Sequence, residues 1–263
     1  MKLTWFDANS WLIEAGGKRI LVDPWLVGDL VFGDAPWLVR GFRPEPLSIP
    51  QNIDLILLSQ GLADHAHPET LKQLDKSIPV MASPDGAKVA NSFGYRSVTT
   101  LEHGDTSSLD NEEGSSITIQ TFVGAPVGPT KKENAYVIDF LAEGTRLYYE
   151  PHGYPDAKHL KTLGTVDVVI TPMADITLMG IAPVVRGKDI APQLADLLNP
   201  QVMLPTAEAG KVEYSGIISS ALKTAGGVEA VRSRLKAKNS NTRIIQPISG
   251  EPVELNLKST VTA

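Results

Sequence analysis

Two histidines and an aspartate that could ligate a metal ion stand within four residues of one another. Asp64, His65 and His67 belong to the segment Ser-Gln-Gly-Leu-Ala-Asp-His-Ala-His, which directly follows the apolar run 53–58. Imidazole nitrogen and carboxylate oxygen are ligands that zinc, iron and manganese accept. The chain has no cysteine, which excludes thiolate zinc sites, iron–sulfur clusters and a cysteine nucleophile. The segment therefore predicts part of a divalent metal site.

Each of these residues also has a structural interpretation. His67 precedes Pro68, and this order is typical of a helix N-cap followed by the first helical residue. Asp64 can bind backbone amides instead of a metal. The chain has five histidines, so a His-based site must draw on few residues. We interpret His103 and His159 as surface residues.

The elements that position this segment follow from apolar runs, prolines and glycines. The Gly16-Gly17 pair between two apolar runs indicates a hairpin, and the run 53–58 indicates a strand buried on both faces. We expect strands at 2–6, 10–14, 19–22, 53–58, 117–123, 135–140, 145–149, 166–171, 202–204, 243–247 and 252–257. We expect helices after His67, at 84–93, 156–163, 189–198 and 228–238.

The length of 263 residues permits two domains at roughly 150 residues each, but no Gly-, Ser- or Pro-rich linker is visible. We therefore predict one α/β domain over residues 1–263. Segments 24–51 and 174–188 are long, apolar and predicted as loops, which are usually lids or binding loops. Their aromatic residues either cover the core or border the entrance of a pocket for a partly apolar ligand. In the second case, Arg40, Arg43 or Arg186 would bind a carboxylate or phosphate of that ligand.

Charge and composition exclude several classes of partner. The net charge is -6 and the isoelectric point is near 5.4, which is unsuited to binding nucleic acid without a local basic patch. The sequence shows no targeting segment, and Asp and Pro residues interrupt its most apolar stretch, so we expect no transmembrane segment. We expect a cytoplasmic protein that acts on a small molecule, and the sequence leaves its oligomeric state open.

Several segments together resemble the metallo-β-lactamase superfamily, in the branch of predicted metal-dependent hydrolases that includes ascorbate-phosphate lactonases and a phospholipase-D-type enzyme. They are Trp11–Glu14 with Arg19–Pro24, Leu57–His65 at the H-x-H-x-D-H metal loop, Glu133–Ile138, Arg146–Gly153 at the turn that carries the family's bridging aspartate, and Asp167–Pro172 with Asn199–Pro205. They occur in the family's order over about residues 1–210. The resemblance implies an αβ/βα four-layer sandwich with a metal site between its sheets.

The sequence departs from the family pattern at the ligands of the first metal position. Gln60 and Leu62 stand where the first two histidines are expected, and no histidine occurs near Val127. Glu150 or His152 occupies the turn of the bridging aspartate, and Glu208 is the ionised candidate near the final histidine. The family's further histidine corresponds to about Ala8. The resemblance thus retains Asp64 and His65, which belong to the second metal position.

Two interpretations follow from this pattern. In the first, one divalent ion (zinc, iron or manganese) is held by Asp64, His65 and His152, with Glu208 or Glu150 as a further ligand. It activates water to hydrolyse an ester, lactone or phosphoester. Residues that support the ion or bind substrate would then be Asp23, Gln60, His67, Glu150, Arg40 and Arg186. In the second, the protein holds no metal and binds an amphipathic, anionic small molecule without catalysis. Loss of the first metal position disfavours β-lactamase activity and a two-metal nuclease mechanism.

Overall fold

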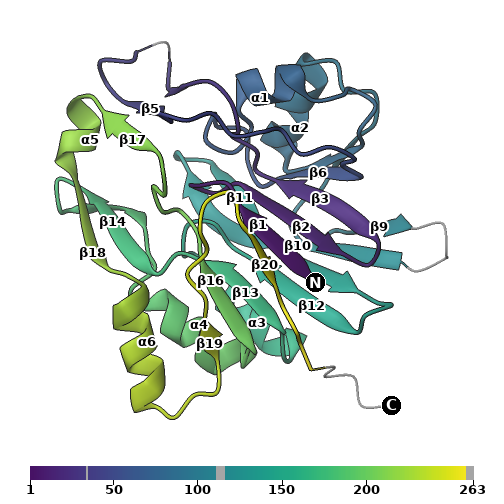
Figure 1. Ribbon diagram of the computed structural model, residues 1–263, viewed down its shortest axis with the longest axis vertical. Helices are drawn as coiled ribbons and strands as arrows, with labels where there is room; N and C mark the ends of the chain where they lie inside the picture. The colour runs from purple at the N-terminus through teal and green to yellow at the C-terminus, as the bar shows by residue number, and fades with distance from the viewer. Residues whose placement is uncertain (34, 111–115, 259–263) are drawn as a thin grey trace. The chain divides into compact units, whose positions relative to one another are not determined.

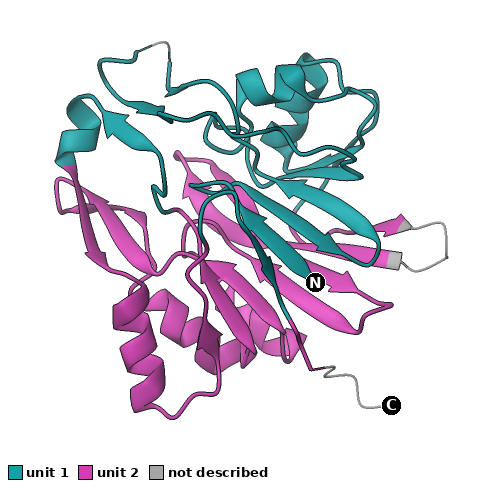
Figure 2. Ribbon diagram, in the orientation of Figure 1, with its two compact units in different colours: residues 1–102, 208–221, 248–255 teal, residues 103–207, 222–247, 256–263 magenta. Residues whose placement is uncertain are grey.

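A computed structural model describes residues 1–33, 35–110 and 116–258 (Figure 1). The chain divides into two compact units (Figure 2). Unit 1 contains residues 1–102, 208–221 and 248–255, and unit 2 contains residues 103–207, 222–247 and those from 256 onward. None of the helices in the described ranges has the length and apolarity needed to cross a membrane.

The larger sheet of unit 1 joins a meander to a set of parallel strands. Its order is β20 (Pro252–Glu254), β1 (Lys2–Trp5), β2 (Trp11–Ala15), β3 (Lys18–Val22), β6 (Leu55–Leu58), β7 (Val80–Ala82) and β8 (Val98–Thr100). Pairing is antiparallel from β20 to β3 and parallel from β3 to β8. The predicted Gly16-Gly17 hairpin is confirmed: both glycines have positive φ, and Ala15 pairs with Lys18.

Two helices of unit 1 follow parallel strands and begin where the sequence predicts. α1 (Pro68–Gln73) has His67 as its N-cap, and α2 (Pro84–Ser92) has Ser83 as its N-cap. Proline suits the first helical position because its missing N–H would have no partner there. Leu71 of α1 and Ala87 of α2 pack with Ile56 and Leu58 of β6 in one buried cluster.

The segment 24–51 contains short strands that the sequence did not predict. β4 (Leu30–Val31), β5 (Arg40–Phe42) and β17 (Glu213–Ser215) form a small sheet in unit 1, and α5 (Ile217–Ala221) follows β17. Trp25 is fully buried and packs with Leu30 and Val212, whereas Trp37 is 66% exposed. Covering the core is therefore the role of Trp25 but not of Trp37.

Unit 2 has a second seven-stranded sheet with the same change of pairing. Its order is β19 (Arg243–Ile244), β16 (Val202–Pro205), β13 (Val168–Thr171), β12 (Thr145–Tyr149), β11 (Lys131–Phe140), β10 (Ser116–Val127) and β9 (Thr106–Asp110). Strands from β9 to β12 are antiparallel, and strands from β12 to β19 are parallel. Parallel neighbours need a crossover, and helices supply it here.

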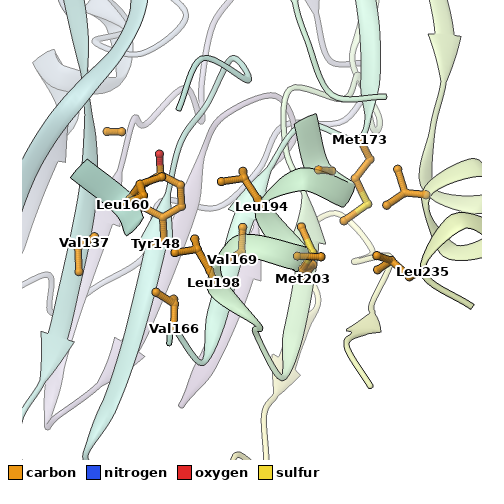
Figure 3. Packing of buried hydrophobic residues seen from close by; sticks show 14 of the residues in the cluster. Val137, Tyr148, Leu160, Val166, Val169, Met173, Leu194, Leu198, Met203 and Leu235 are labelled. Carbon is orange, nitrogen blue, oxygen red and sulfur yellow. The ribbon is translucent and has the colours of Figure 1, made fainter. Parts of the chain in front are cut away.

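Helices α3 (Ala157–Leu163), α4 (Ile190–Leu198) and α6 (Val228–Ala237) close the core of unit 2. Leu160, Leu194 and Leu235, one from each helix, share a buried cluster with Val169 and Met203 of the sheet (Figure 3). The predicted helix at 156–163 corresponds to α3, and the Asp156 carboxylate caps it by accepting the His159 amide. Asp189 stands at the N-cap of α4 without a side-chain capping bond, and its carboxylate pairs with Arg234 instead.

The segment 174–188 is largely strand, which corrects its interpretation as a loop. β14 (Ala174–Leu178) pairs antiparallel with β15 (Ala182–Val185) and with β18 (Leu222–Gly226). Met179 and Gly180 turn the chain between β14 and β15, and both have positive φ. Met179 and Ile181 at this turn are exposed, so the hairpin presents an apolar tip.

Candidate functional site

The segment that carries Asp64 and His65 is a tight loop at the end of β6, within unit 1. The amides of His65 and Ala66 donate to the Leu62 carbonyl at 2.9 and 2.8 Å, which turns the chain back on itself. His65 is fully buried, whereas Asp64 is partly exposed. The loop therefore fixes the imidazole in the interior and leaves the neighbouring carboxylate near the surface.

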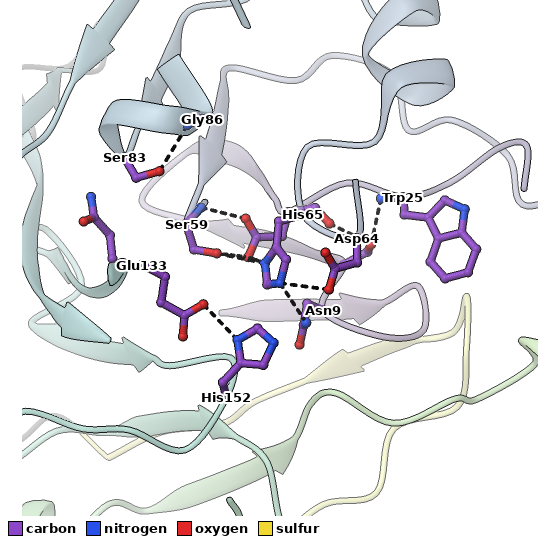
Figure 4. A network of polar contacts seen from close by, with 12 residues as sticks. Asn9, Trp25, Ser59, Asp64, His65, Ser83, Gly86, Glu133 and His152 are labelled. Carbon is purple, nitrogen blue, oxygen red and sulfur yellow. Dashed lines mark hydrogen bonds and ion pairs between the residues drawn. The ribbon is translucent and has the colours of Figure 1, made fainter. Parts of the chain in front are cut away.

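The Asp23 carboxylate is hydrogen-bonded to one ring nitrogen of His65. Nδ1 of His65 lies 2.8 Å from Oδ2 of Asp23 and 2.9 Å from Oγ of Ser59 (Figure 4). Ser59 also donates to both Asp23 oxygens, from its amide at 2.7 Å and its hydroxyl at 2.6 Å. Because a carboxylate accepts, Nδ1 carries a proton, so the neutral ring has its lone pair on Nε2, the atom that a metal requires.

The other ring nitrogen of His65 faces a second carboxylate and an amide. Nε2 lies 3.3 Å from Oδ2 of Asp64 and 3.3 Å from Nδ2 of Asn9. Burial by itself lowers the pKa of His65, but the charges of Asp64 and Asp23 outweigh it and raise the pKa well above the ordinary value. The pocket around Nε2 thus favours positive charge, which a proton or a metal ion can supply.

The turn between β1 and β2 places Asn9 against His65. Asp7 and Ala8 both have left-handed backbone angles, with φ of 68° and 47°. Such angles in non-glycine residues cost free energy and often accompany functional sites. The Ala8 amide donates to the Glu208 carbonyl at 2.8 Å, so the two positions where the resemblance expects histidines are adjacent in unit 1. Glu208 itself is half-buried, and its role as a ligand stays a prediction.

Three other predicted residues of unit 1 have identifiable surroundings. His67 caps α1, and its Nε2 donates to the Asp29 carbonyl at 3.1 Å, so both ring nitrogens serve the local structure. Gln60 is buried in the loop after β6. Arg40 is exposed and pairs with the Asp29 carboxylate. Their predicted supporting or substrate-binding roles remain predictions.

Unit 2 contains a second histidine held by a carboxylate. Nδ1 of His152 lies 2.8 Å from Oε2 of Glu133, which is fully buried (Figure 4). The Oε1 atom of Glu133 accepts the Ala125 amide at 3.0 Å, and Gly124 leaves room for this side chain because a Cβ there would meet Glu133 Cγ at 2.6 Å. Because this carboxylate accepts, Nδ1 of His152 carries a proton, and the neutral ring has its lone pair on Nε2.

Glu150 shapes the turn that carries His152. Its carboxylate accepts the His152 amide at 3.2 Å and the Gly153 amide at 2.5 Å. Burial, together with the nearby Glu133 charge, raises the pKa of Glu150 to about 7. This carboxylate is turned toward backbone amides, so it supports the turn that presents His152.

Arg186 is anchored to the same turn. Its amide donates to the His152 carbonyl at 2.9 Å, and its guanidinium lies 5.3 Å from the centre of the Tyr154 ring. The side chain is exposed, and its role in substrate binding stays a prediction. His103 and His159 are exposed, as the sequence predicts.

Sequence reasoning missed Asn9, Ser59 and Glu133, three groups whose side chains contact the ring of His65 or His152. Ser59 stood in the metal-loop segment and Glu133 in a segment of the family resemblance, but neither was given a role. Glu133 is 19 positions from His152, and no local pattern joins them. Asn9 follows two left-handed residues, a backbone feature that sequence alone does not reveal.

A family model described as the beta-lactamase superfamily domain matches residues 2–207 of this chain. Among curated proteins, a UPF0173 metal-dependent hydrolase of Bacillus cereus is 28% identical over 200 residues, covering 68% of this chain and 76% of that protein. Another UPF0173 metal-dependent hydrolase, from Agrobacterium fabrum, is 24% identical over 190 residues, with the same shares covered.

Solved structures with low sequence identity share the fold. An isothiocyanate hydrolase from Delia radicum gut bacteria has a TM-score of 0.69 at 15% identity, covering 97% of this chain and 99% of that one. The metallo hydrolase Igni18 of Ignicoccus hospitalis has a TM-score of 0.66 at 14% identity, with the same coverage. The predicted α/β fold class of metallo-β-lactamase type is confirmed. The chain belongs to the metallo-β-lactamase superfamily and is a hydrolase-like member related to its metal-dependent hydrolases.

Proposed function

We propose that the protein hydrolyses an ester, lactone or phosphoester of a small molecule with one divalent ion held by Asp64, His65 and His152. The observation that carries the proposal is that two histidines each have Nδ1 bonded to a buried carboxylate, Asp23 for His65 and Glu133 for His152. Histidines that ligate metals are commonly oriented in this way. The proposal requires both units to act as one domain, residues 1–263, in which His65 and His152 ligate the same ion.

The donor atoms within unit 1 fit a divalent ion. The Nε2 atom of His65 and the Oδ2 atom of Asp64 lie 3.3 Å apart, a separation that two ligands of one ion can have. Nitrogen and oxygen donors without thiolate suit zinc, iron or manganese. Leu62 cannot ligate and is 45% exposed, which supports a single ion in place of the family's pair. Glu208 is proposed as a further ligand.

A divalent ion bound there would polarise the substrate oxygen and lower the pKa of a water molecule toward neutrality. The residues of this chain would orient the ligands and the substrate. Asp23 and Glu133 keep both imidazoles in the tautomer that presents Nε2, and Glu150 holds the turn around His152. Gln60 and His67 would support the loop that carries Asp64 and His65.

The substrate is proposed to be amphipathic and anionic. Arg186 is the stronger candidate to bind its charged group, since its guanidinium is exposed and stacked on Tyr154. Arg40 is a second candidate, although its pairing with Asp29 partly neutralises it.

Metal content measured by mass spectrometry tests this function. The protein would carry no histidine tag and meet no chelator, and His65→Ala, His152→Ala and the double variant would be purified in parallel. We expect about one equivalent of zinc, iron or manganese in the wild type and a loss of metal in each variant. His159→Ala is the matched control, because His159 is an exposed histidine of unit 2.

The metal-loaded protein would then be tested with ester, lactone and phosphodiester substrates. Hydrolysis that depends on the added metal and is lost with His152→Ala supports the proposal. Equal metal content in the wild type and in both single variants contradicts the assignment of ligands. Absence of metal from every form, with unchanged stability, favours a metal-free protein that binds a small molecule.

A further inference from the structure

A cavity of about 570 Å³ lies within unit 2, beside the turn that carries His152. It is lined by Val123, Gly124, Pro126, Lys132, Gly153, Tyr154, Pro155, Asp156, Ala157, Arg186, Ile190 and Gln193. Gly153 directly follows His152, and Lys132 directly precedes Glu133. The volume is typical of a small-molecule site. The walls of this cavity are thus built from the same segments that position the proposed ligand.

The charge on the wall of the cavity is mainly positive. Lys132 and Arg186 line it, and Asp156 is the acidic residue among its lining groups. The Asp156 carboxylate is already engaged, since it accepts the His159 amide at 3.3 Å and pairs with the His159 ring at 2.5 Å. Two cations and one carboxylate engaged elsewhere favour an anionic occupant.

Arg186 lies at the edge of this cavity, and both its backbone and its guanidinium have contacts there. Its backbone lies so close to Gly153 that a Cβ on Gly153 would meet the Arg186 carbonyl oxygen at 1.5 Å. Its guanidinium is stacked on the Tyr154 ring, and the Tyr154 hydroxyl donates to the Pro183 carbonyl at 3.3 Å. Because this contact orients the guanidinium before an anion binds, the side chain loses little conformational entropy on binding.

Apolar side chains also line the wall, together with the polar Gln193. Val123 and Pro126 come from β10, and Ile190 comes from the first turn of α4. Such a wall suits the hydrocarbon part of a ligand, whereas a wholly polar ion would leave it in contact with water.

We propose that this cavity binds the anionic end of a small amphipathic substrate, with Arg186 and Lys132 contacting its carboxylate or phosphate and β10 and α4 contacting its hydrocarbon part. The inference rests on the proposed hydrolytic function, because it assigns the cavity that holds the substrate of that reaction. It assigns Lys132 and Tyr154 roles beyond the metal chemistry: Lys132 contacts the anion, and Tyr154 positions Arg186.

Ligand-observed NMR with three probes of equal chain length tests the cavity. Hexanoate, hexylphosphonate and 1-hexanol would be titrated separately into the purified protein, and neither anionic probe is a substrate for hydrolysis. We expect at least one anion to bind about tenfold more tightly than 1-hexanol, and Arg186→Gln and Lys132→Gln each to weaken it about fivefold. Added salt should weaken the binding of that anion but not of 1-hexanol.

Lys236→Gln on α6 is the control, because it removes one positive charge of unit 2 away from the cavity. A preference for hexanoate supports a carboxylate substrate, and a preference for hexylphosphonate supports a phosphate. Equal binding of 1-hexanol and both anions overturns the inference. So does anion binding that neither Arg186→Gln nor Lys132→Gln weakens.

These outcomes are separable from those of the proposed function, since the probes report binding without metal or turnover. Anion selectivity that Arg186→Gln removes, found in a protein without hydrolytic activity, supports the cavity and contradicts the hydrolytic function. Metal-dependent hydrolysis without anion selectivity contradicts the cavity alone.

Discussion

The Asp23 carboxylate is fully buried and accepts from the Ser59 amide, the Ser59 hydroxyl and the His65 ring. It keeps His65 in a single orientation and tautomer. The sequence predicts that Asp23 supports the metal ion; the structure shows its contact with His65, and the role toward a metal stays a prediction.

We expect Asp23→Asn to weaken metal binding by about 10- to 100-fold, the usual effect of removing a carboxylate that supports a ligating histidine. Asparagine tolerates the positive φ of 44° at this position, so the backbone is kept. A competition titration against a chromophoric chelator measures the affinity.

The control for this variant is Asp54→Asn, which changes a partly exposed carboxylate that binds the Arg19 amide in the same unit. Equal loss of affinity in the two variants would refute the role of Asp23.

Residue types were enough to select candidate metal ligands, but not to predict the groups around them. His65 and His152 are conspicuous because the chain has five histidines, and Asp64 because it is next to His65. Their contacts with Asn9 and Glu133 depend on a strained turn and on a pairing between strands, and neither leaves a local sequence pattern. Distant polar partners of this kind become visible only when the chain is folded.

At the scale of elements, boundaries were predictable where the first residues of a helix determine its start. His67 with Pro68 and Ser83 with Pro84 located α1 and α2 correctly. The β14–β15 hairpin was missed because Asp175 and Pro183 made an otherwise apolar segment resemble a loop. Asp175 in fact accepts the amides of Gly187 and Lys188, at 2.9 and 3.0 Å, and fastens the base of the hairpin.

The N-cap of α1 predicts how stability depends on pH. Burial lowers the pKa of His67 below its ordinary value of 6.5, although the Asp29 carbonyl partly offsets this effect. Between the folded pKa and 6.5 the unfolded chain binds more protons, so His67 makes the free energy of unfolding fall as the pH decreases through that window.

We expect His67→Asn to remove this contribution, because asparagine caps helices well and does not titrate. Urea unfolding at about pH 7.5 and about pH 5.5 should show a smaller decrease in stability for the variant than for the wild type. An unchanged or larger decrease would mean that His67 is not held neutral by its surroundings.

The contact between Gly153 and Arg186 predicts a second effect at this scale. Gly153 has a φ of 80°, and a Cβ there would overlap the Arg186 carbonyl. We expect Gly153→Ala to cost about 2–5 kcal/mol of stability, from left-handed strain and from displacement of the chain after β15.

Gly128→Ala is the matched control, since Gly128 has a φ of 70° with open space around its Cα. It should cost about 1–2 kcal/mol, the strain alone. Chemical denaturation measures the free energy of unfolding of both variants. Equal losses would mean that the backbone near Arg186 moves to accommodate the added Cβ at little cost.

At the scale of the whole molecule, the proposed ligands belong to both compact units. Binding of one ion by His65 and His152 should therefore stabilise the entire chain. We expect zinc, iron or manganese at about 100 times its dissociation constant to add about 2.7 kcal/mol of stability. Calorimetry with and without metal measures the change in Tm.

The His65→Ala and His152→Ala variants should each lose most of this gain, because each removes a ligand from a different unit. A gain in Tm that persists undiminished in His152→Ala would confine metal binding to unit 1.

The family and the fold class were predictable at this scale because the matching segments keep their order along the chain, although no single segment is decisive.

The pairing of β1 with β20 has a consequence for biosynthesis. β1 lies between β2 and β20 in its sheet, and the Leu255 amide donates to the Met1 carbonyl at 2.9 Å. On the ribosome β1 emerges first among the strands of this sheet and β20 last. One edge of β1 therefore has no partner while residues 6–251 are synthesised, and an exposed strand edge can pair with other chains. A nascent chain of this protein should rely on a chaperone that shields this edge until β20 emerges.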